Sequence, residues 1–281
     1  MSRQAYYQGR ARRRERDARE AKALEVVRSE RRLQKRLGTR KLYGMYYAVF
    51  RKLKVGRDAL FDLLRRMKLL VRPRRARYAT TNSSHGFAPA PNLVVDRKPP
   101  KEPNEVWASD ITYFRVGQRH CYAALVTDCY SRKIVGYDLS ESLSVGGSLR
   151  ALRQALRARQ KRQGEQLRPL IHHSDQGSQY ACGTYKNTLR KAKVRPSMAS
   201  RGNPYENPLA ERVNGILKDE YGLGETFGTF RQAKQALREA VKLYNERRPH
   251  NCLKKATPAM VHAGKTGRYT PPEAERYVNL F

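Results

Sequence analysis

The spacing of apolar residues divides the chain into a helical first quarter and a later part in which strands and helices alternate. A highly charged helix is predicted over residues 17–37, and helical spacing of apolar residues predicts a second over 42–53, followed by a third over 57–70. Gly38 ends the first helix, and Gly56 separates the second from the third. The residues that we expect on the buried face of the second helix are Leu42, Met45, Tyr46, Val49, Phe50 and Leu53.

Two short helices joined at a glycine are typical of a helix-turn-helix motif, whose later helix enters the major groove of DNA. In that arrangement the third helix turns its polar side chains to DNA and its apolar ones inward. The candidate DNA contacts are Arg57, Asp58, Arg65 and Arg66. The expected buried residues are Leu60, Phe61, Leu63, Leu64 and Met67. A plain helical hairpin that packs on the rest of the protein is the alternative.

Prolines and small polar residues mark the next segment. Six prolines between residues 71 and 104 predict an extended linker, with a domain boundary near residue 100. We therefore divide the chain into a basic helical region over 1–72, a linker over 73–104, an α/β domain over 105–265 and a C-terminal tail over 266–281.

The pattern changes after the linker to strands with short connections. Segments 106–116, 119–127 and 132–138 are predicted to form an antiparallel meander, because their turns are too short for crossovers. Next come a helix over 145–163, a strand that ends at Asp175, a helix over 183–193 and a strand over 194–198. Two helices, one starting at Pro208 and one over 229–247, complete the order. The fold class is α/β.

Charge points to a polyanionic partner. The chain has 59 Lys and Arg against 25 Asp and Glu, a formal net charge of +34. Of these, 26 basic and 7 acidic residues lie in residues 1–80, so the excess is concentrated where we place DNA binding. No apolar run is long enough for a membrane span and no secretory signal is evident, so we expect a cytoplasmic protein. Four cysteines without CxxC spacing are expected to be reduced and mostly buried.

Three acidic residues stand in unusual positions. Asp110 interrupts an apolar strand, where an unpaired charge is costly. Asp175 lies at the end of a strand, where sites of α/β sheets are built. Glu211 falls one turn into a helix, with Asn207 as its N-cap and Pro208 as its first residue, and 35 residues separate it from Asp175. Such a trio can hold two Mg²⁺ ions, or Mn²⁺ as a substitute, for phosphodiester chemistry. Three unrelated surface acids are the alternative.

Other residues beside the trio have simpler interpretations. Asp128 is expected to form a turn at the end of its strand and not to act as a fourth acid. His172 and His173 either orient Asp175, contact DNA or serve packing, and the predicted chemistry needs no imidazole.

The motifs as a whole resemble the catalytic core of DDE transposases and retroviral integrases, specifically insertion-sequence transposases of the IS-three type in their orfB form. The resemblance covers nearly the whole chain. It rests on Trp107 with Asp110-Ile111-Thr112, on His173-Ser174-Asp175-Gln176-Gly177-Ser178-Gln179-Tyr180, on Gly202-Asn203-Pro204-Tyr205 before Asn207, Glu211 and Lys218, and on Tyr244-Asn245, Arg248-Pro249-His250 and Thr257-Pro258. Glu206 and Pro208 depart mildly from the pattern.

This resemblance implies a ribonuclease H-like mixed sheet in which the first and fourth strands are neighbours. It makes Asp110, Asp175 and Glu211 the catalytic residues and metal ligands. Lys218 would hold a DNA phosphate, and Arg201 and Asn203 of the loop before Glu211 are further candidate DNA contacts.

The implied activity is metal-dependent cleavage and strand transfer of double-stranded DNA, by a dimer or higher oligomer. An upstream-frame (orfA) protein or frameshift fusion is a further expected partner, since in the family resembled an upstream reading frame adds a helix-turn-helix and a coiled coil by translational frameshifting. A ribonuclease H-like nuclease without joining activity and a non-catalytic DNA-binding protein are the alternatives.

Overall fold

The computed structural model describes residues 2–71, 88–163, 168–200 and 206–280 of the 281. The chain forms two compact units. The helical unit comprises Met1–Arg75, Pro249–Ala256 and Thr266–Phe281, and the sheet unit comprises Ala76–Arg248 and Thr257–Lys265. The helical unit therefore includes residues that the sequence analysis assigned to the α/β domain and to a C-terminal tail.

The helical unit is built from α1 (Arg3–Leu33), α2 (Thr39–Met45), α3 (Tyr47–Lys52), α4 (Arg57–Arg66) and α11 (Glu273–Leu280). The predicted second helix is two helices, because the chain bends at Tyr46. All six apolar residues expected on its buried face are buried. The side chain of Tyr46 is itself in the core, where its hydroxyl donates to the buried carboxylate of Glu30 on α1 at 2.6 Å.

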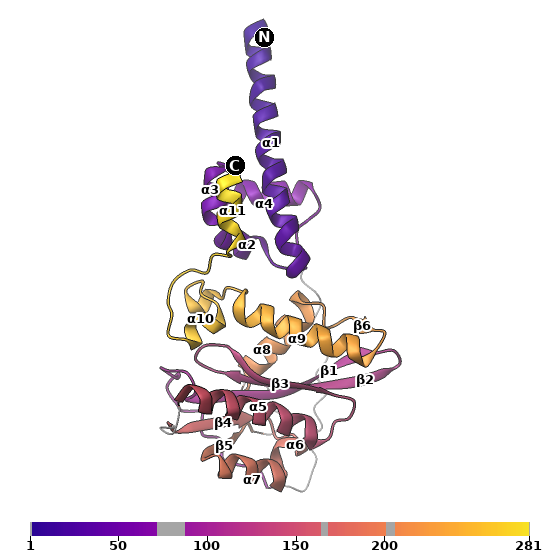
Figure 1. Cartoon of the computed structure of the whole chain (residues 1–281), viewed down its shortest axis with the longest axis vertical. Helices are drawn as coiled ribbons and strands as arrows, with labels where there is room; N and C mark the ends of the chain where they lie inside the picture. The colour runs from indigo at the N-terminus through magenta and orange to yellow at the C-terminus, as the bar shows by residue number, and fades with distance from the viewer. Residues whose placement is uncertain (1, 72–87, 164–167, 201–205, 281) are drawn as a thin grey trace. The chain divides into compact units, whose positions relative to one another are not determined.

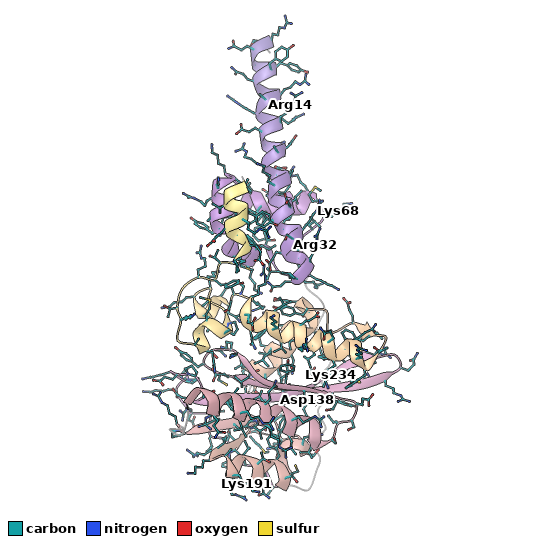
Figure 2. The ribbon with its side chains drawn as sticks, in the orientation of Figure 1. Arg14, Arg32, Lys68, Asp138, Lys191 and Lys234 are labelled. Atoms are coloured by element: carbon teal, nitrogen blue, oxygen red, sulfur yellow. The ribbon has the colours of Figure 1, made fainter. Side chains whose placement is uncertain are left out.

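α1 begins well before the predicted start at residue 17. Ser2 caps it, since its hydroxyl accepts a hydrogen bond from the backbone N–H of Ala5 at 3.2 Å. Residues 3–18 are exposed, and Figure 2 shows side chains on all sides of this part of α1 around Arg14. The buried contacts of α1 come later, from Ala23 to Glu30. A pattern of apolar residues reveals only that second part.

The residues of the predicted tail also fold into the helical unit. Tyr277 of α11 packs edge-on against Tyr46, with 6.2 Å between the ring centroids. Lys52 at the end of α3 donates to the carbonyl of Val278 at 2.5 Å. α11 therefore completes the core of this unit.

Two expectations about buried side chains are wrong. Met67 is 45% exposed, because α4 ends at Arg66 and the backbone at Lys68 has a φ of 54°, which turns the chain away. The four cysteines are free, as predicted, but only Cys121 is buried and Cys252 is exposed. Phe61 is half-buried, whereas Leu60, Leu63 and Leu64 are buried as expected.

The sheet unit contains β1 (Val106–Val116), β2 (Arg119–Asp128), β3 (Ile134–Ser140), β4 (Leu170–Ser174), β5 (Val194–Met198) and the short β6 (Thr226–Phe227). The strand order is β3-β2-β1-β4-β5, and β6 pairs with β1. β1, β2 and β3 form the predicted antiparallel meander. β4 runs parallel to β1 and to β5, so the first and fourth strands are neighbours, as the ribonuclease H-like arrangement requires.

Helices cover both faces of this sheet (Figure 1). One face packs against α5 (Val145–Gln163), α6 (Ser178–Ala181) and α7 (Gly183–Lys191), with Trp107 fully buried between them. The other face packs against α8 (Pro208–Glu220) and α9 (Phe230–Glu246), and α10 (Pro258–His262) contacts α9. β2 shows the alternation clearly, since Ala124 and Val126 join the first core while Ala123 and Leu125 join the second.

Gly136 on β3 allows α5 to lie very close to the sheet. A Cβ at this position would stand 2.1 Å from the carbonyl oxygen of Ala151 on α5. We expect Gly136→Ala to lower the free energy of unfolding by about 1–3 kcal/mol, because the helix must move away. Urea unfolding measures this loss. Gly183→Ala, where a Cβ meets no atom within 4 Å, is the matched control, and an equal loss in both variants would contradict the explanation.

Candidate active site

The pairing of β1 with β4 brings two of the predicted acids to neighbouring positions. In the parallel register Ser109 is opposite Ser174, and Asp110 and Asp175 are the next residues along the chain. Neighbouring strands lie about 4.8 Å apart. β4 ends at Ser174, so Asp175 begins the turn in which its Oδ1 accepts a hydrogen bond from the backbone N–H of Gly177 at 3.1 Å.

Two asparagines fasten α8 to β1 and so bring Glu211 to the same place. Asn207 donates from Nδ2 to the carbonyl oxygen of Ser109 at 3.0 Å, and Asn214 donates from Nδ2 to Oδ2 of Asp110 at 2.7 Å. Asn207 holds the predicted N-cap position and Pro208 begins the helix, but the Asn207 side chain does not cap it. Glu211 lies in the first turn and its side chain is exposed.

The electrostatics of Asp110 show that the three carboxyl groups interact. Its pKa is raised from 3.8 to about 7, first because burial disfavours the charged form and then because of the negative charge of Asp175. Glu211 raises it further. A hydrogen bond from the backbone N–H of Ile111, at 2.8 Å, and the charge of Lys218 act in the opposite direction.

This arrangement fits a divalent cation in its chemistry. The donors are hard carboxylate oxygens, which Mg²⁺ prefers, and their mutual repulsion is what a cation would relieve. Within the described part of the chain, no three His, Cys, Asp or Glu side chains converge tightly enough to enclose a metal ion.

Lys218 lies two turns after Glu211 on α8 and reaches the same region. Its Nζ is 4.3 Å from the centre of the Tyr113 ring. Burial lowers the pKa of Lys218, while the negative charges of Asp110 and Asp219 raise it. The ammonium group of Lys218 is therefore close enough to Asp110 for the two charges to interact.

The two histidines before the turn of Asp175 serve the packing of the sheet. Nε2 of His172 lies 2.8 Å from Oγ of Ser109 and 2.9 Å from the hydroxyl of Tyr185, and burial lowers the pKa of His172 to about 3. Nδ1 of His173 lies 2.9 Å from Oγ of Ser197, and burial lowers its pKa. Both are buried neutral groups that join neighbouring elements.

Asp128 forms the turn that the sequence predicts. Its Oδ1 accepts hydrogen bonds from the backbone N–H of Ser131 at 2.7 Å and from the Ser131 hydroxyl at 2.6 Å. Its Oδ2 accepts from the backbone N–H of Asn104 at 2.7 Å. With both oxygens committed to backbone and hydroxyl donors, it is a structural residue.

The predicted DNA contacts of the helical unit carry charges that are paired within the unit. Arg57 pairs with Asp58 at 2.9 Å, Arg66 pairs with Glu20 at 2.7 Å, and Arg65 pairs with Asp62. Their contact with DNA stays a prediction. Arg201 and Asn203 lie outside the described residues.

Sequence reasoning missed Asn214 and Tyr185. Asn214 is three residues after Glu211, so helical spacing puts it on the same face of α8, and this signal was available. Tyr185 belongs to α7, and its hydrogen bond to His172 depends on how that helix packs, which spacing does not reveal.

Comparison with known proteins shows the family of the chain. Two family models, each described as Integrase core domain, match residues 100–204 and 192–258. An uncharacterized 31 kDa protein of insertion element IS600 from Shigella sonnei is 35% identical over 206 residues, which cover 73% of this chain and 74% of that protein. A transposase for insertion sequence element IS904 from Lactococcus lactis is 32% identical, over 70% of this chain and 76% of that protein.

Among solved structures, the HTLV-2 integrase catalytic core domain in complex with magnesium has a TM-score of 0.46 and 16% identity, over 58% of this chain and 98% of that one. The simian T-cell lymphotropic virus intasome has a TM-score of 0.49 and 18% identity, over 83% of this chain and 77% of that one.

The two matched family models place the chain in the integrase-core class. The chain belongs to the integrase-core transposases of insertion sequences, of the IS-three type. In the described residues no helix is both long and apolar enough to span a membrane.

Because the pKa of Asp110 is raised, we expect that replacing this residue by asparagine increases the free energy of unfolding, and that the increase depends on pH. The folded state binds this proton more tightly than the unfolded state, so the contribution of Asp110 to the stability of the wild type falls as pH rises from about 4 to about 7. Asp110→Asn does not titrate. In EDTA we expect it to be more stable than wild type by roughly 1–3 kcal/mol at pH 8, with the difference fading by pH 4.

Urea unfolding at several pH values measures this difference. Asp96→Asn, which replaces an exposed acid, is the control and is expected to show no such trend. A variant that is less stable than wild type at pH 8 would argue that Asp110 is paired and not crowded.

Proposed function

We propose that this protein catalyses divalent-metal-dependent cleavage and strand transfer of insertion-sequence DNA. The observation that carries the proposal is the register of β1 and β4, which makes Asp110 and Asp175 neighbours under the start of α8. Membership in the integrase-core transposases supports the reaction class.

In this proposal Asp110, Asp175 and Glu211 hold two Mg²⁺ ions, and Mn²⁺ substitutes for them. The bound ions supply activation of the attacking oxygen and stabilisation of charge on the leaving oxygen. A related integrase core in complex with magnesium is consistent with this choice of cation.

The chain's own residues orient these groups. Asn214 and the backbone N–H of Ile111 each donate to a different oxygen of Asp110, so they fix the plane of its carboxylate. Lys218 lies two turns after Glu211 on α8 and binds a phosphate of the DNA near the reacting bond.

The proposed partners are double-stranded DNA, further copies of the same chain and an upstream-frame protein. Strand transfer joins an element end to target DNA, and two ends must be held together, so at least a dimer is required. An intasome among the similar structures is consistent with an assembly of this kind. The helical unit, with the arginines of α4, is the proposed reader of the element end.

The test is nicking and joining of supercoiled plasmid that carries the element ends, in Mn²⁺. We expect Asp175→Asn and Glu211→Gln each to reduce both products by at least about a hundredfold, because each removes a charged metal ligand. DNA binding in EDTA, measured in parallel, separates loss of chemistry from loss of binding.

Glu246→Gln, an exposed acid at the end of α9, is the matched control and should retain activity. Nicking without joined products would select the nuclease alternative. Activity that survives in Asp175→Asn would overturn the assignment of the site. Intact binding without cleavage, even with the upstream-frame protein supplied, would select the non-catalytic alternative.

Asn214 provides a finer prediction about positioning. Asn214→Ala removes the donor to Oδ2 of Asp110, and we expect kcat for nicking to fall roughly ten- to a hundredfold with DNA affinity nearly unchanged. Asn214→Gln, which keeps an amide but moves it, should recover part of the rate. A weakened affinity at unchanged kcat would instead place Asn214 in contact with DNA.

A further inference from the structure

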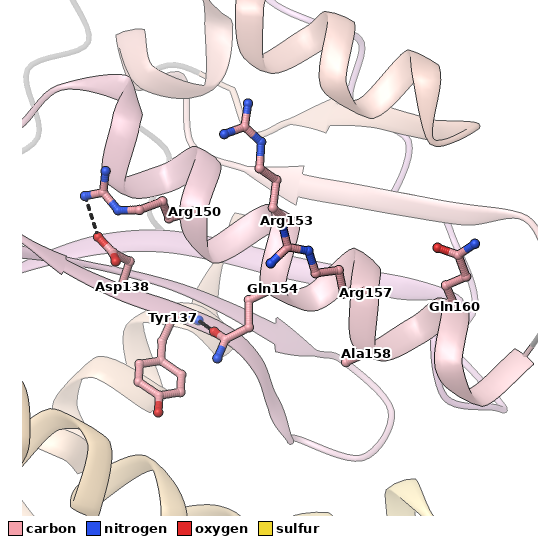
Figure 3. A pocket seen from close by; sticks show the side chains of 8 residues that line it. All are labelled: Tyr137, Asp138, Arg150, Arg153, Gln154, Arg157, Ala158 and Gln160. Atoms are coloured by element: carbon pink, nitrogen blue, oxygen red, sulfur yellow. Dashed lines mark hydrogen bonds and ion pairs between the residues drawn. The ribbon is translucent and has the colours of Figure 1, made fainter.

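A basic groove lies along β3 and α5, away from the carboxylates. It has a volume of about 800 Å³ and is lined by Tyr137, Asp138, Arg150, Arg153, Gln154, Arg157, Ala158 and Gln160 (Figure 3). β3 is the edge strand of the sheet, and α5 covers the face opposite α8. None of the three acidic residues contributes to this groove.

The three arginines of the groove are in different electrostatic states. Arg150 donates to Asp138 at 2.8 Å and is thereby neutralised. Arg153 and Arg157 are exposed, and no carboxylate of the described residues pairs with either of them; in Figure 3 only Arg150 is joined to Asp138. The described part of α5 contains no acidic residue at all. Two free guanidinium groups are therefore held one turn apart.

A second basic stripe flanks the same edge strand from the other face of the sheet. α9 contacts β3 and carries Arg231, Lys234, Arg238 and Lys242 at spacings of three and four residues. These side chains are exposed, and Figure 2 labels Lys234 among them. The part of the structure that is described pairs none of the four with a carboxylate. Their spacing places them on one side of the helix.

Tyr137 connects the two stripes. Its backbone N–H donates to Oε1 of Gln154 on α5 at 2.7 Å, so the exposed edge of β3 is closed at this point. Its ring packs in the core on the α9 side, close enough to Arg238 for the two to interact electrostatically. The stripes thus meet across β3 and form one surface, which we call the β3-edge surface.

The spacing of the free arginines matches a nucleic-acid backbone better than an acidic peptide. Residues four apart on a helix are separated by about 6 Å along its axis, close to the rise of two steps along a DNA strand. The guanidinium fork matches phosphate oxygens in geometry. A second copy of this chain would bring two positively charged faces together, which is unfavourable.

We propose that the β3-edge surface binds the phosphate backbone of duplex DNA at a place separate from the carboxylates. The inference rests on the proposed function only in that the protein acts on DNA. In an enzyme that joins two DNA segments, the surface holds a segment other than the one at the carboxylates.

The test compares Arg153→Gln/Arg157→Gln with Arg190→Gln/Lys191→Gln in the full chain. Both pairs are exposed and remove the same charge, but the second pair lies at the end of α7, outside the surface. The probe is a labelled duplex of about 30 base pairs in EDTA, titrated at several salt concentrations.

We expect the first pair to raise Kd about tenfold near 0.1 M salt and to lower the slope of log K against log salt by about 1.8, the loss of two phosphate contacts. The α7 pair should leave the slope near the wild-type value. Lys234→Gln/Arg238→Gln should lower the slope in the same way, and combining both pairs should lower it further. Circular dichroism melting confirms that each variant is folded.

Equal slopes for the α5 double variant and the α7 double variant would overturn the inference. An altered oligomeric state of the α5 double variant with unchanged DNA binding would also overturn it, because that result would mark a contact with protein. A lowered slope for the α5 pair would support it even if the wild type failed to cut DNA, since no metal is present. A wild-type chain that did not bind the duplex would contradict the proposed function as well.

Discussion

The parallel pairing of β1 with β4 is the constraint on which the rest of this site depends. Asp110 and Asp175 are 65 residues apart in sequence, and only the register of Ser109 with Ser174 makes them neighbours. A slip by one residue would turn one carboxylate to the opposite face. The buried contacts of His172 with Ser109 and Tyr185 lie directly behind this register and join β1, β4 and α7. Packing thus fixes the separation of the two acids before any metal or DNA is present.

That arrangement has an unfavourable electrostatic consequence which the neighbouring residues reduce only in part. Burial and the charge of Asp175 raise the pKa of Asp110 to about 7, although Asn214, Ile111 and Lys218 all favour its charged form. The remaining repulsion destabilises the fold and creates a place where a cation is favoured. Stability and cation affinity therefore have opposite requirements at Asp110, as is common where a site needs like charges close together.

Sequence periodicity predicted the sheet unit well because its elements have one buried side and regular spacing. The bounds of β1, α5 and β5 agree with the predictions. Periodicity failed where helices lack a buried face or depend on distant partners. The first part of α1 is exposed throughout, and α11 belongs to the core only because it packs beside Tyr46. In the candidate site, motifs singled out the three acids, whose role stays a prediction, whereas the hydrogen bond from Asn214 to Asp110 required the orientation of α8 over β1.

The distribution of basic residues along the sequence also does not reveal which of them are paired with acids in the folded protein. The excess of basic residues is concentrated in residues 1–80, yet the arginines of α4 that were expected to contact DNA are paired with Asp58, Asp62 and Glu20. Each such pair must open, or be shared, before its arginine can bind a phosphate. Arg153 and Arg157 need no such rearrangement, because the described part of α5 has no acid and Asp138, the acid that lines the groove, is paired with Arg150. Whether a basic side chain is free of an acidic partner, and not the number of basic side chains along the chain, determines where a phosphate backbone is bound most readily.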